Sequence, residues 1–203
     1  MIESSSKTES IQEAQIRPLT PGDWALVEAL FGSKGACGGC WCMYWRVPHG
    51  GKEFEALRGA PAKSALRGLI EKNKVFALIA LEGSEPVGWI CLGPTEDFPR
   101  LNSVKALAHE REAGTWAIVC LYLRPKARRQ GIGTRLIEGA CDFAFRRGVR
   151  GIEGYPVNVR PDSTMPGAFA WTGVPAMFEK AGFARLERSI ETRSIWQART
   201  GQS

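Results

Sequence analysis

Apolar and polar positions follow one another along the chain with spacings that predict both short strands and amphipathic helices. Strands are expected at 16–19, in a hairpin over 74–93 that turns at Gly83–Ser84, at 116–123, at 151–157, and as a final pair between 183 and 198. Helices are expected from Pro21 to Phe31 and over 61–73, 134–147 and 174–182. The run "WAIVCLYL" at 116–123 is almost wholly apolar, which is typical of a strand covered on both faces.

The first 15 residues, "MIESSSKTESIQEAQ", break this pattern because they are polar and rich in serine. We expect residues 1–15 to be a disordered tail and residues 16–198 to form a single domain, since no linker or repeat interrupts them. No run approaches the roughly 18 apolar residues that a membrane span needs, and no secretory signal is present. A cytoplasmic protein is therefore expected, whose six cysteines are thiols or ligands rather than disulfides.

Charge narrows the possible partners. The net charge of +6 favours an anionic partner, which could be a phosphate group, a nucleic acid or a membrane. Nucleic-acid binding is disfavoured because basic and aromatic residues do not interleave on the predicted strands. We expect neither a nucleic acid nor a membrane as partner, which leaves a phosphate-bearing small molecule.

The stretch "ARRQGIG", residues 127–133, is here called the glycine turn; it joins the strand at 116–123 to the next helix. The first turn of a helix carries free N–H groups and the positive end of the helix dipole. Gly131 and Gly133 have no Cβ to keep an oxygen away, and Arg128 and Arg129 offer charge-assisted hydrogen bonds. The turn is a candidate pyrophosphate site, although a plain strand-to-helix turn with surface arginines would explain it in isolation.

Other phosphate-binding loops fit less well. A Walker loop needs Gly-Lys-Ser/Thr, which is missing here. A dinucleotide fingerprint needs a third glycine, where Leu136 stands.

The run "LYLRPKARRQGIGTRLIEGACDFA" resembles the acetyl-CoA-binding motif of the GNAT superfamily of acyltransferases. Leu123-x-Pro125 and Arg128-x-x-Gly131-x-Gly133 carry the likeness, and "MFEKAGF" resembles the second signature of the family. The resemblance covers residues 16–198 and implies an α/β (α+β) fold. In that fold a mixed central sheet is flanked by helices and splays between its fourth and fifth strands.

The resemblance also implies the cofactor site. Acetyl-CoA is the expected co-substrate, with its pantetheine arm in the splayed gap and no metal ion. Backbone groups of Leu121 and Leu123 would bind the pantetheine amides, and N–H groups from Arg129 to Thr134 would hold the pyrophosphate. The complete predicted set is Leu121, Tyr122, Leu123, Arg128, Arg129, Gln130, Gly131, Ile132, Gly133, Thr134 and Phe178.

Acetyl transfer to an amine needs a neutral amine, an oxyanion donor and a proton for the departing thiolate. The strand at 116–123 carries no acid, so Glu153 on the next strand is the preferred base, ahead of Glu96, Asp97 and His109. Family members often have a Tyr, as proton donor, where this chain has Phe178. Tyr122 and Tyr155 are the alternative donors, with core packing as the default role of both. Trp171 replaces an Asn that is common in the family.

The segment "CGGCWCMYWRVPH" suggests three alternatives. Cys37, Cys40, Cys42 and His49 are eligible zinc ligands, but C-x-C beside C-x₂-C suits one tetrahedral centre poorly. A reactive thiol is the second alternative and packed, pocket-lining thiols are the third, which we favour. The predicted acceptor pocket consists of Cys40, Trp41, Tyr44, Trp45 and Trp171. Cys91, Cys120 and Cys141 are expected in the core, and the connection at 158–173 is expected to fold over the acceptor.

These observations predict an acetyl-CoA-dependent N-acetyltransferase. It would act on a primary amine of a small molecule or peptide, by direct attack in a ternary complex. The aromatic pocket favours a flat or apolar-tailed amine over a polycation. Phe178 and the acid-free strand leave open a non-catalytic acyl-CoA-binding sensor. A homodimer is compatible with the family, in which dimers are frequent, and the acceptor itself stays unassigned.

Overall fold

One mixed sheet runs through the residues that the computed structural model describes, which are 13–158, 171–187 and 193–201. Its strands, in spatial order, are β1 (Gln15–Pro18), β2 (Phe76–Glu82), β3 (Glu85–Pro94), β4 (Trp116–Leu123), β5 (Gly151–Gly154), β7 (Trp196–Arg199) and β6 (Ala184–Arg185). Neighbouring strands are antiparallel except β4 and β5, which are parallel. The predicted class, a mixed sheet with flanking helices, is confirmed.

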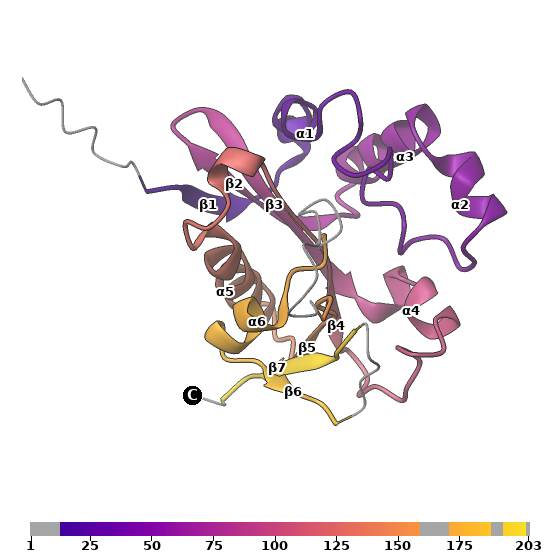
Figure 1. Ribbon diagram of the computed structural model, residues 1–203, viewed down its shortest axis with the longest axis vertical. Coiled ribbons are helices and arrows are strands. Elements are labelled where there is room, and N and C mark those ends of the chain that lie inside the picture. The colour runs from indigo at the N-terminus through magenta and orange to yellow at the C-terminus, as the bar shows by residue number, and fades with distance from the viewer. Residues whose placement is uncertain (1–12, 159–170, 188–192, 202–203) are drawn as a thin grey trace, which may run out of the picture.

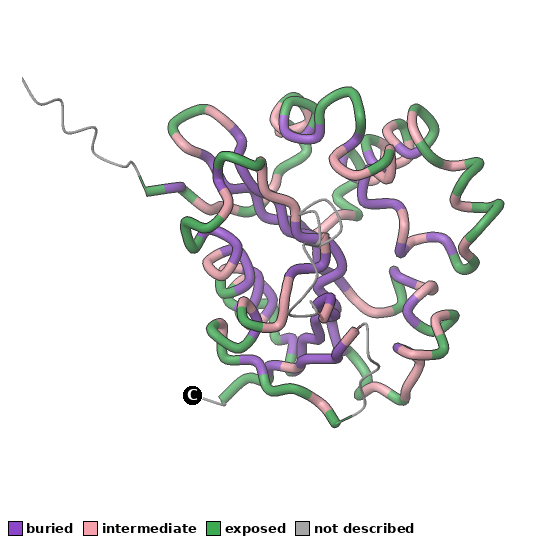
Figure 2. The backbone as a smooth tube through the Cα atoms, in the orientation of Figure 1, coloured by how far each residue is buried: buried purple, intermediate pink, exposed green. Residues whose placement is uncertain are grey.

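Helices cover both faces of this sheet (Figure 1). They are α1 (Trp24–Phe31), α2 (Lys52–Leu57), α3 (Ala60–Glu71), α4 (Arg100–Ser103), α5 (Ile132–Phe145) and α6 (Pro175–Lys180), with 3₁₀ turns at Pro21–Asp23, Thr95–Asp97 and Pro125–Ala127. Helices α5 and α6 lie on one face, and α1 to α4 lie on the other. Each face buries its own apolar cluster, so the buried residues concentrate along the central strands (Figure 2).

Two local features fix the ends of helices. Asp23 accepts hydrogen bonds from the backbone N–H and the hydroxyl of Thr20, both at 2.7 Å, which fixes the turn that leads into α1. Gly148, two residues beyond the C-cap of α5, adopts a left-handed φ of 80°, which ends that helix.

The boundaries differ from the prediction at four places. The chain is ordered before residue 16, because Ala14 is buried and Gln15 begins β1; residues 1–12 of the predicted tail lie outside the described part. Helix α2 was not predicted, because its six residues are too few to show helical periodicity against the surrounding glycines. Helix α5 begins at Ile132, and β5 ends at Gly154, earlier than the predicted strand end.

The predicted splay between the fourth and fifth strands is present. Pairing between β4 and β5 covers only Trp116–Ile118 with Ile152–Gly154, so the second half of β4 has no β5 partner. A bulge lies at the same point, where Val119 falls between the residues that pair with Cys91 and Leu92 of β3. A gap therefore opens at the middle of β4, next to the strand end that leads into the glycine turn.

None of the helices in the described ranges is both long enough and apolar enough to span a bilayer.

Candidate active site

The glycine turn has the backbone geometry of an anion-binding site. Arg129 and Gly131 adopt left-handed φ angles of 62° and 78° on either side of Gln130, and α5 begins at the next residue. Alternating handedness turns consecutive N–H groups toward one point, and the first turn of α5 adds its own unpaired N–H groups. No atom lies within 4 Å of the position that a Cβ on Gly131 would occupy, so the space in front of the turn is open.

The residues of this turn have different surroundings. Arg128 donates from Nε to the carbonyl of Leu123 at 3.2 Å, which ties the turn to the end of β4. Arg129 is exposed. A Cβ on Gly133 would lie 1.9 Å from Cε of Met177, so this glycine lets α5 and α6 pack together. Packing of the two helices therefore requires a glycine at position 133 whether or not its N–H also binds a ligand.

The gap between β4 and β5 already contains a short segment of the chain. The N–H of Leu121 donates to the carbonyl of Trp171 at 2.7 Å, and the N–H of Val157 donates to Gly173 at 3.1 Å. A pantetheine amide would therefore have to compete with Trp171 for the N–H of Leu121. Phe178 is fully buried behind Gly154 and Gly173 and presents no surface to a cofactor in this arrangement.

Glu153 lies at the centre of a buried group that we call the Glu153 network: Glu153, His109, Arg111 and Tyr155. Its carboxylate lies 2.9 Å from His109 Nε2, 2.9 Å from Arg111 Nε and 2.8 Å from the Tyr155 hydroxyl, which donates to it. The Glu153 side chain is 1% exposed. The other ring nitrogen of His109 faces the carbonyl of Leu107 at 2.9 Å.

This network is closed to acid–base chemistry with a substrate. Burial raises the pKa of Tyr155 well above its usual value, and Glu153 raises it further. Burial would lower the pKa of Arg111, but Tyr155 and Glu153 hold it above its usual value. The carboxylate has three partners and no surface, so the geometry argues against Glu153 as the base and against Tyr155 as the acid. Tyr122, the third predicted catalytic residue, is half-buried on the splayed half of β4, edge-on to Phe31.

The predicted acceptor pocket divides into two groups. The rings of Tyr44, Trp45 and Trp171 pack together. The centroid of the Tyr44 ring lies 5.1 Å from that of Trp45 and 5.0 Å from that of Trp171. Trp41 packs instead against Trp24 of α1, at 5.9 Å, and is 2% exposed. Trp41 therefore belongs to the core. Its neighbour Cys40 is half-buried, and its thiol approaches the carbonyl of Gly35.

Comparison with protein families identifies the chain. A sequence model described as the acetyltransferase (GNAT) family matches residues 41–160, more than half of the chain. The chain belongs to the GNAT family of acetyltransferases. The match includes β4, the glycine turn and all of α5, which are the elements beside the open turn and the gap.

Solved structures share the fold of this GNAT acetyltransferase at low sequence identity. PaiA N-acetyltransferase from Thermoplasma acidophilum, in complex with coenzyme A, is 18% identical with a TM-score of 0.52, over 92% of this chain and 98% of that chain. YncA from Salmonella typhimurium, with acetyl-CoA, is 12% identical with a TM-score of 0.55, over 94% and 96%. AAC(6')-Ib with ribostamycin and coenzyme A is 18% identical with a TM-score of 0.55, over 94% of each chain. Comparison with curated proteins gives no match.

In this GNAT enzyme the cysteine-rich segment is built for packing. Trp41 and Cys42 adopt left-handed φ angles of 43° and 55°, a strain of about 1–3 kcal/mol each that persists only where packing enforces it. Trp89 donates from its indole to Cys42 Sγ at 3.2 Å, and burial raises the pKa of the Cys42 thiol well above its usual value. His49 is exposed. Within the described ranges, no three His, Cys, Asp or Glu side chains are grouped so that they could hold a metal ion.

Sequence reasoning missed three arginines of this face. Arg111 joins the Glu153 network, and the Arg100 guanidinium lies 4.0 Å above the Tyr44 ring. Arg193 lies 5.4 Å from the Trp171 ring. A local signal existed for Arg100, because the fully buried residues Phe98 and Leu101 flank it closely. No local signal marked Arg193, since its partners are distant in sequence.

The connection at 158–173, which is predicted to fold over the acceptor, consists largely of residues 159–170, outside the described part of the chain.

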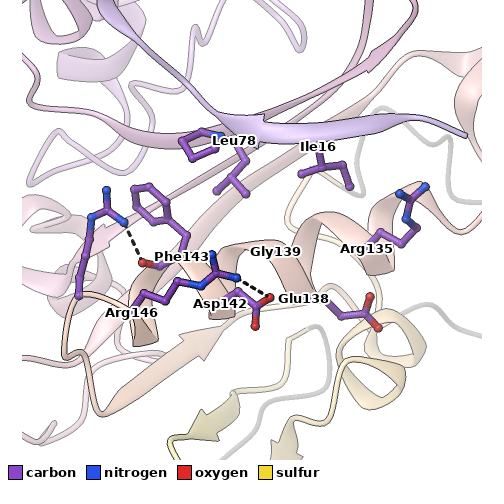
Figure 3. Close-up of a pocket in the computed structure, with 10 residues that line it drawn as sticks. Ile16, Leu78, Arg135, Glu138, Gly139, Asp142, Phe143 and Arg146 are labelled. Carbon is purple, nitrogen blue, oxygen red and sulfur yellow. Dashed lines mark hydrogen bonds and ion pairs between the residues drawn. The ribbon is translucent and has the colours of Figure 1, made fainter.

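A separate groove of about 420 Å³ lies on the opposite face, between α5 and the β1–β2 edge (Figure 3). Its floor is apolar, with Ile16 and Leu78, and its rim charges are mixed. Arg146 lies 3.6 Å from Asp142 within this rim. None of the predicted site residues lines the groove, so it provides a reference surface rather than a site.

Proposed function

We propose that this GNAT enzyme transfers the acetyl group of acetyl-CoA to a primary amine of a small molecule or peptide, by direct attack in a ternary complex. One observation carries the proposal: the open, left-handed glycine turn directly follows the strand half that has lost its β5 partner. An anion-binding turn at the end of an unpaired strand suits a ligand with a pyrophosphate at one end and an amide-bearing arm. The complexes of structural neighbours with coenzyme A or acetyl-CoA support the same ligand.

The reaction requires few groups from the protein. The amine nitrogen attacks the thioester carbonyl, the C–S bond breaks, and the thiolate takes up a proton while the amine loses one to solvent. The bulge at Val119 leaves backbone groups outside the β3 register at the point where the gap opens, which suits a donor to the developing oxyanion. Tyr122 lies on the splayed half of β4 and is our choice for the proton donor. The arm would replace the Trp171 carbonyl at Leu121.

Calorimetric titration with acetyl-CoA and with CoA tests the cofactor site. Wild type should bind with a Kd in the micromolar range, and Gly131→Glu should weaken binding at least about 100-fold by placing an anion in the open space before the turn. Gly131→Ala is the matched control, because it shares the left-handed strain without the charge. Folded wild type that does not bind either ligand would refute the proposal.

Turnover distinguishes the enzyme from the acyl-CoA sensor. Mass spectrometry should detect acetylated product with at least one amine of a panel, and Tyr122→Phe should lower kcat about 100-fold while acetyl-CoA affinity stays unchanged. Acetyl-CoA binding without product from any amine would favour the sensor. An unchanged kcat in Tyr122→Phe would remove Tyr122 as proton donor.

A further inference from the structure

Five side chains around the aromatic residues form a group that we call the aromatic–arginine cluster: Tyr44, Trp45, Trp171, Arg100 and Arg193. Its polar atoms are only partly satisfied. Trp45 is 3% exposed, yet its indole N–H has no hydrogen-bond partner among the described residues. Nε and Nη1 of Arg100 are buried and have no partner there either. An unpaired buried donor costs about 1–3 kcal/mol, and more when charged, so three in one place indicate a missing acceptor.

The two guanidinium groups stack on neighbouring rings of the cluster. Arg100 stacks on the Tyr44 ring and donates from Nη2 to its hydroxyl at 3.0 Å, while a Cβ on Gly50 would lie 2.2 Å from the same nitrogen. Arg193 lies over Trp45 and Trp171, and it donates from Nη1 to the hydroxyl of Thr172 at 2.8 Å. Both cations are therefore held in place, which is the preorganisation that a ligand site requires.

The charge of this cluster is not compensated within the described ranges. No carboxylate there lies within ion-pair distance of Arg100 or Arg193, and the nearby Glu153 is fully engaged by its own network. Burial lowers the pKa of Arg193, and only the phenol of Tyr44 acts against this effect. Burying a guanidinium without a counter-ion is costly, so the cluster fits an anion as its occupant.

The cluster borders the expected path of the cofactor. The carbonyl of Trp171 accepts the N–H of Leu121 on the splayed half of β4, and the Trp171 ring packs on Tyr44 and Trp45. A ligand on these rings would therefore lie beside the pantetheine arm.

We propose that the aromatic–arginine cluster binds a carboxylate of the acceptor, so that the substrate is an aromatic or apolar amine that also carries a carboxylate. The identification of the ligand as the acceptor substrate rests on the proposed acetyl transfer. The identification of its anionic group as a carboxylate rests on the buried donors without partners. A carboxylate supplies two oxygens for the donors of Trp45 and Arg100, and its single charge offsets the guanidinium excess. The aromatic rings would hold the apolar part of the molecule. Polycationic amines such as ribostamycin should be rejected, because two fixed guanidinium groups repel them.

Matched pairs of amines test the proposal. Phenylalanine is compared with phenylalaninamide, and 4-(aminomethyl)benzoate with its carboxamide, which covers two spacings between amine and carboxylate. For at least one pair, wild type should show a kcat/KM about 30-fold higher for the acid, as expected for charged hydrogen bonds that the carboxamide cannot make. A difference in amine ionisation cannot explain a preference for phenylalanine. The amine of phenylalaninamide is less basic than that of phenylalanine, so a larger fraction of it is neutral, and ionisation alone would favour the carboxamide.

Variants assign the preference to the cluster. In Arg100→Gln the acid-to-carboxamide ratio should fall to within about 3-fold, while Arg100→Lys should keep part of it. Arg146→Gln, in the groove of Figure 3, removes the same charge from the other face and should leave the ratio unchanged. Carboxamides used as well as acids by wild type, or an equal loss for acid and carboxamide in Arg100→Gln, would overturn the proposal.

A binding measurement separates this proposal from the proposed function. If no amine is turned over, protein saturated with CoA is titrated calorimetrically with each acid and each carboxamide. If CoA itself does not bind, the same titrations are done with protein without cofactor. Tighter binding of an acid, lost in Arg100→Gln, would keep the carboxylate site while acetyl transfer fails. Equal binding of acid and carboxamide, or binding of neither, would overturn the site.

Discussion

Two groups of buried charge lie on the same face of the sheet and are built in opposite ways. In the Glu153 network one carboxylate receives hydrogen bonds from a tyrosine and an arginine and contacts a histidine, and no oxygen is left over. In the aromatic–arginine cluster two guanidinium groups lie over aromatic rings, and among the described residues three buried donors have no partner. The first group contains a carboxylate together with the Arg111 cation, whereas the second contains cations and no carboxylate within the described ranges.

The difference teaches how to separate structural charge from functional charge. A closed network contributes its hydrogen bonds to folding and has nothing left to offer a ligand. In an open cluster the unpaired donors make no hydrogen bonds that would stabilise the fold, so they are available to a bound molecule. Buried donors without partners are otherwise unfavourable, and such exceptions are expected at functional sites. This criterion favours a structural role for Glu153, which the sequence indicates as a base, and the proposed ligand-binding role for Arg100, which the sequence did not single out.

The largest effect is expected from Glu153→Gln. Loss of the carboxylate leaves Arg111 as an unpaired buried cation, which should lower the free energy of unfolding by about 3–5 kcal/mol. Urea denaturation measures the change, and Glu112→Gln is the control, because Glu112 is 61% exposed and pairs with Arg199 at the surface. If the Glu153→Gln variant has wild-type stability but no turnover, the result would support Glu153 as the general base.

A smaller effect is expected from Tyr155→Phe. The change removes one hydrogen bond to a charged acceptor and preserves the ring, so the free energy of unfolding should fall by about 1.5–3 kcal/mol. Thermal melting measures it, alongside kcat for any amine that is turned over. A kcat reduced about 100-fold at unchanged stability would make Tyr155 a proton donor instead.

Arg100→Gln should change stability by no more than about 1 kcal/mol, because removal of a cation without a counter-ion offsets the lost contact with Tyr44. The matched variant is Arg111→Gln on the same face, which should cost about 3 kcal/mol because it breaks a buried pair. Denaturation of both proteins at one pH gives the comparison. Equal losses in the two variants would contradict the division into closed and open groups.

A similarly small effect is expected at a compensated pair that is less buried, Asp23 with Arg17. The hydrogen bonds of Asp23 to Arg17 hold the pKa of its carboxyl well below the usual range. Asp23→Asn should therefore cost about 1 kcal/mol at pH 7. This contribution is complete above the unfolded-state pKa of about 3.9 and disappears as the pH falls through the lower folded-state pKa. Stability curves of wild type and variant should converge in acid; parallel curves would exclude the ionised carboxylate as the cause.

The fold was largely predictable because its signals are local. Apolar periodicity located β2, β3, β4 and α5, and the glycine turn with its arginines indicated the cofactor site. Helix α2 was missed because it is short, and the packing role of Gly133 could not be predicted because its neighbour, Met177, comes from a distant helix. The surroundings of the predicted pocket residues were hidden for the same reason. Trp41 and Trp45 are four residues apart in one aromatic segment, yet they pack against different aromatic partners.

The sequence by itself determined the family, the order of the elements and the position of the glycine turn. Each of these depends on residues that are close in the chain, where spacing fixes geometry. Only the tertiary structure decided which charges are satisfied. Glu153 meets His109 and Arg111 across more than 40 positions, and Arg100 meets Tyr44 across 56. Whether a buried cation has a counter-ion depends on such long-range contacts, so the distinction between a structural carboxylate and an open carboxylate site appears only in the folded chain.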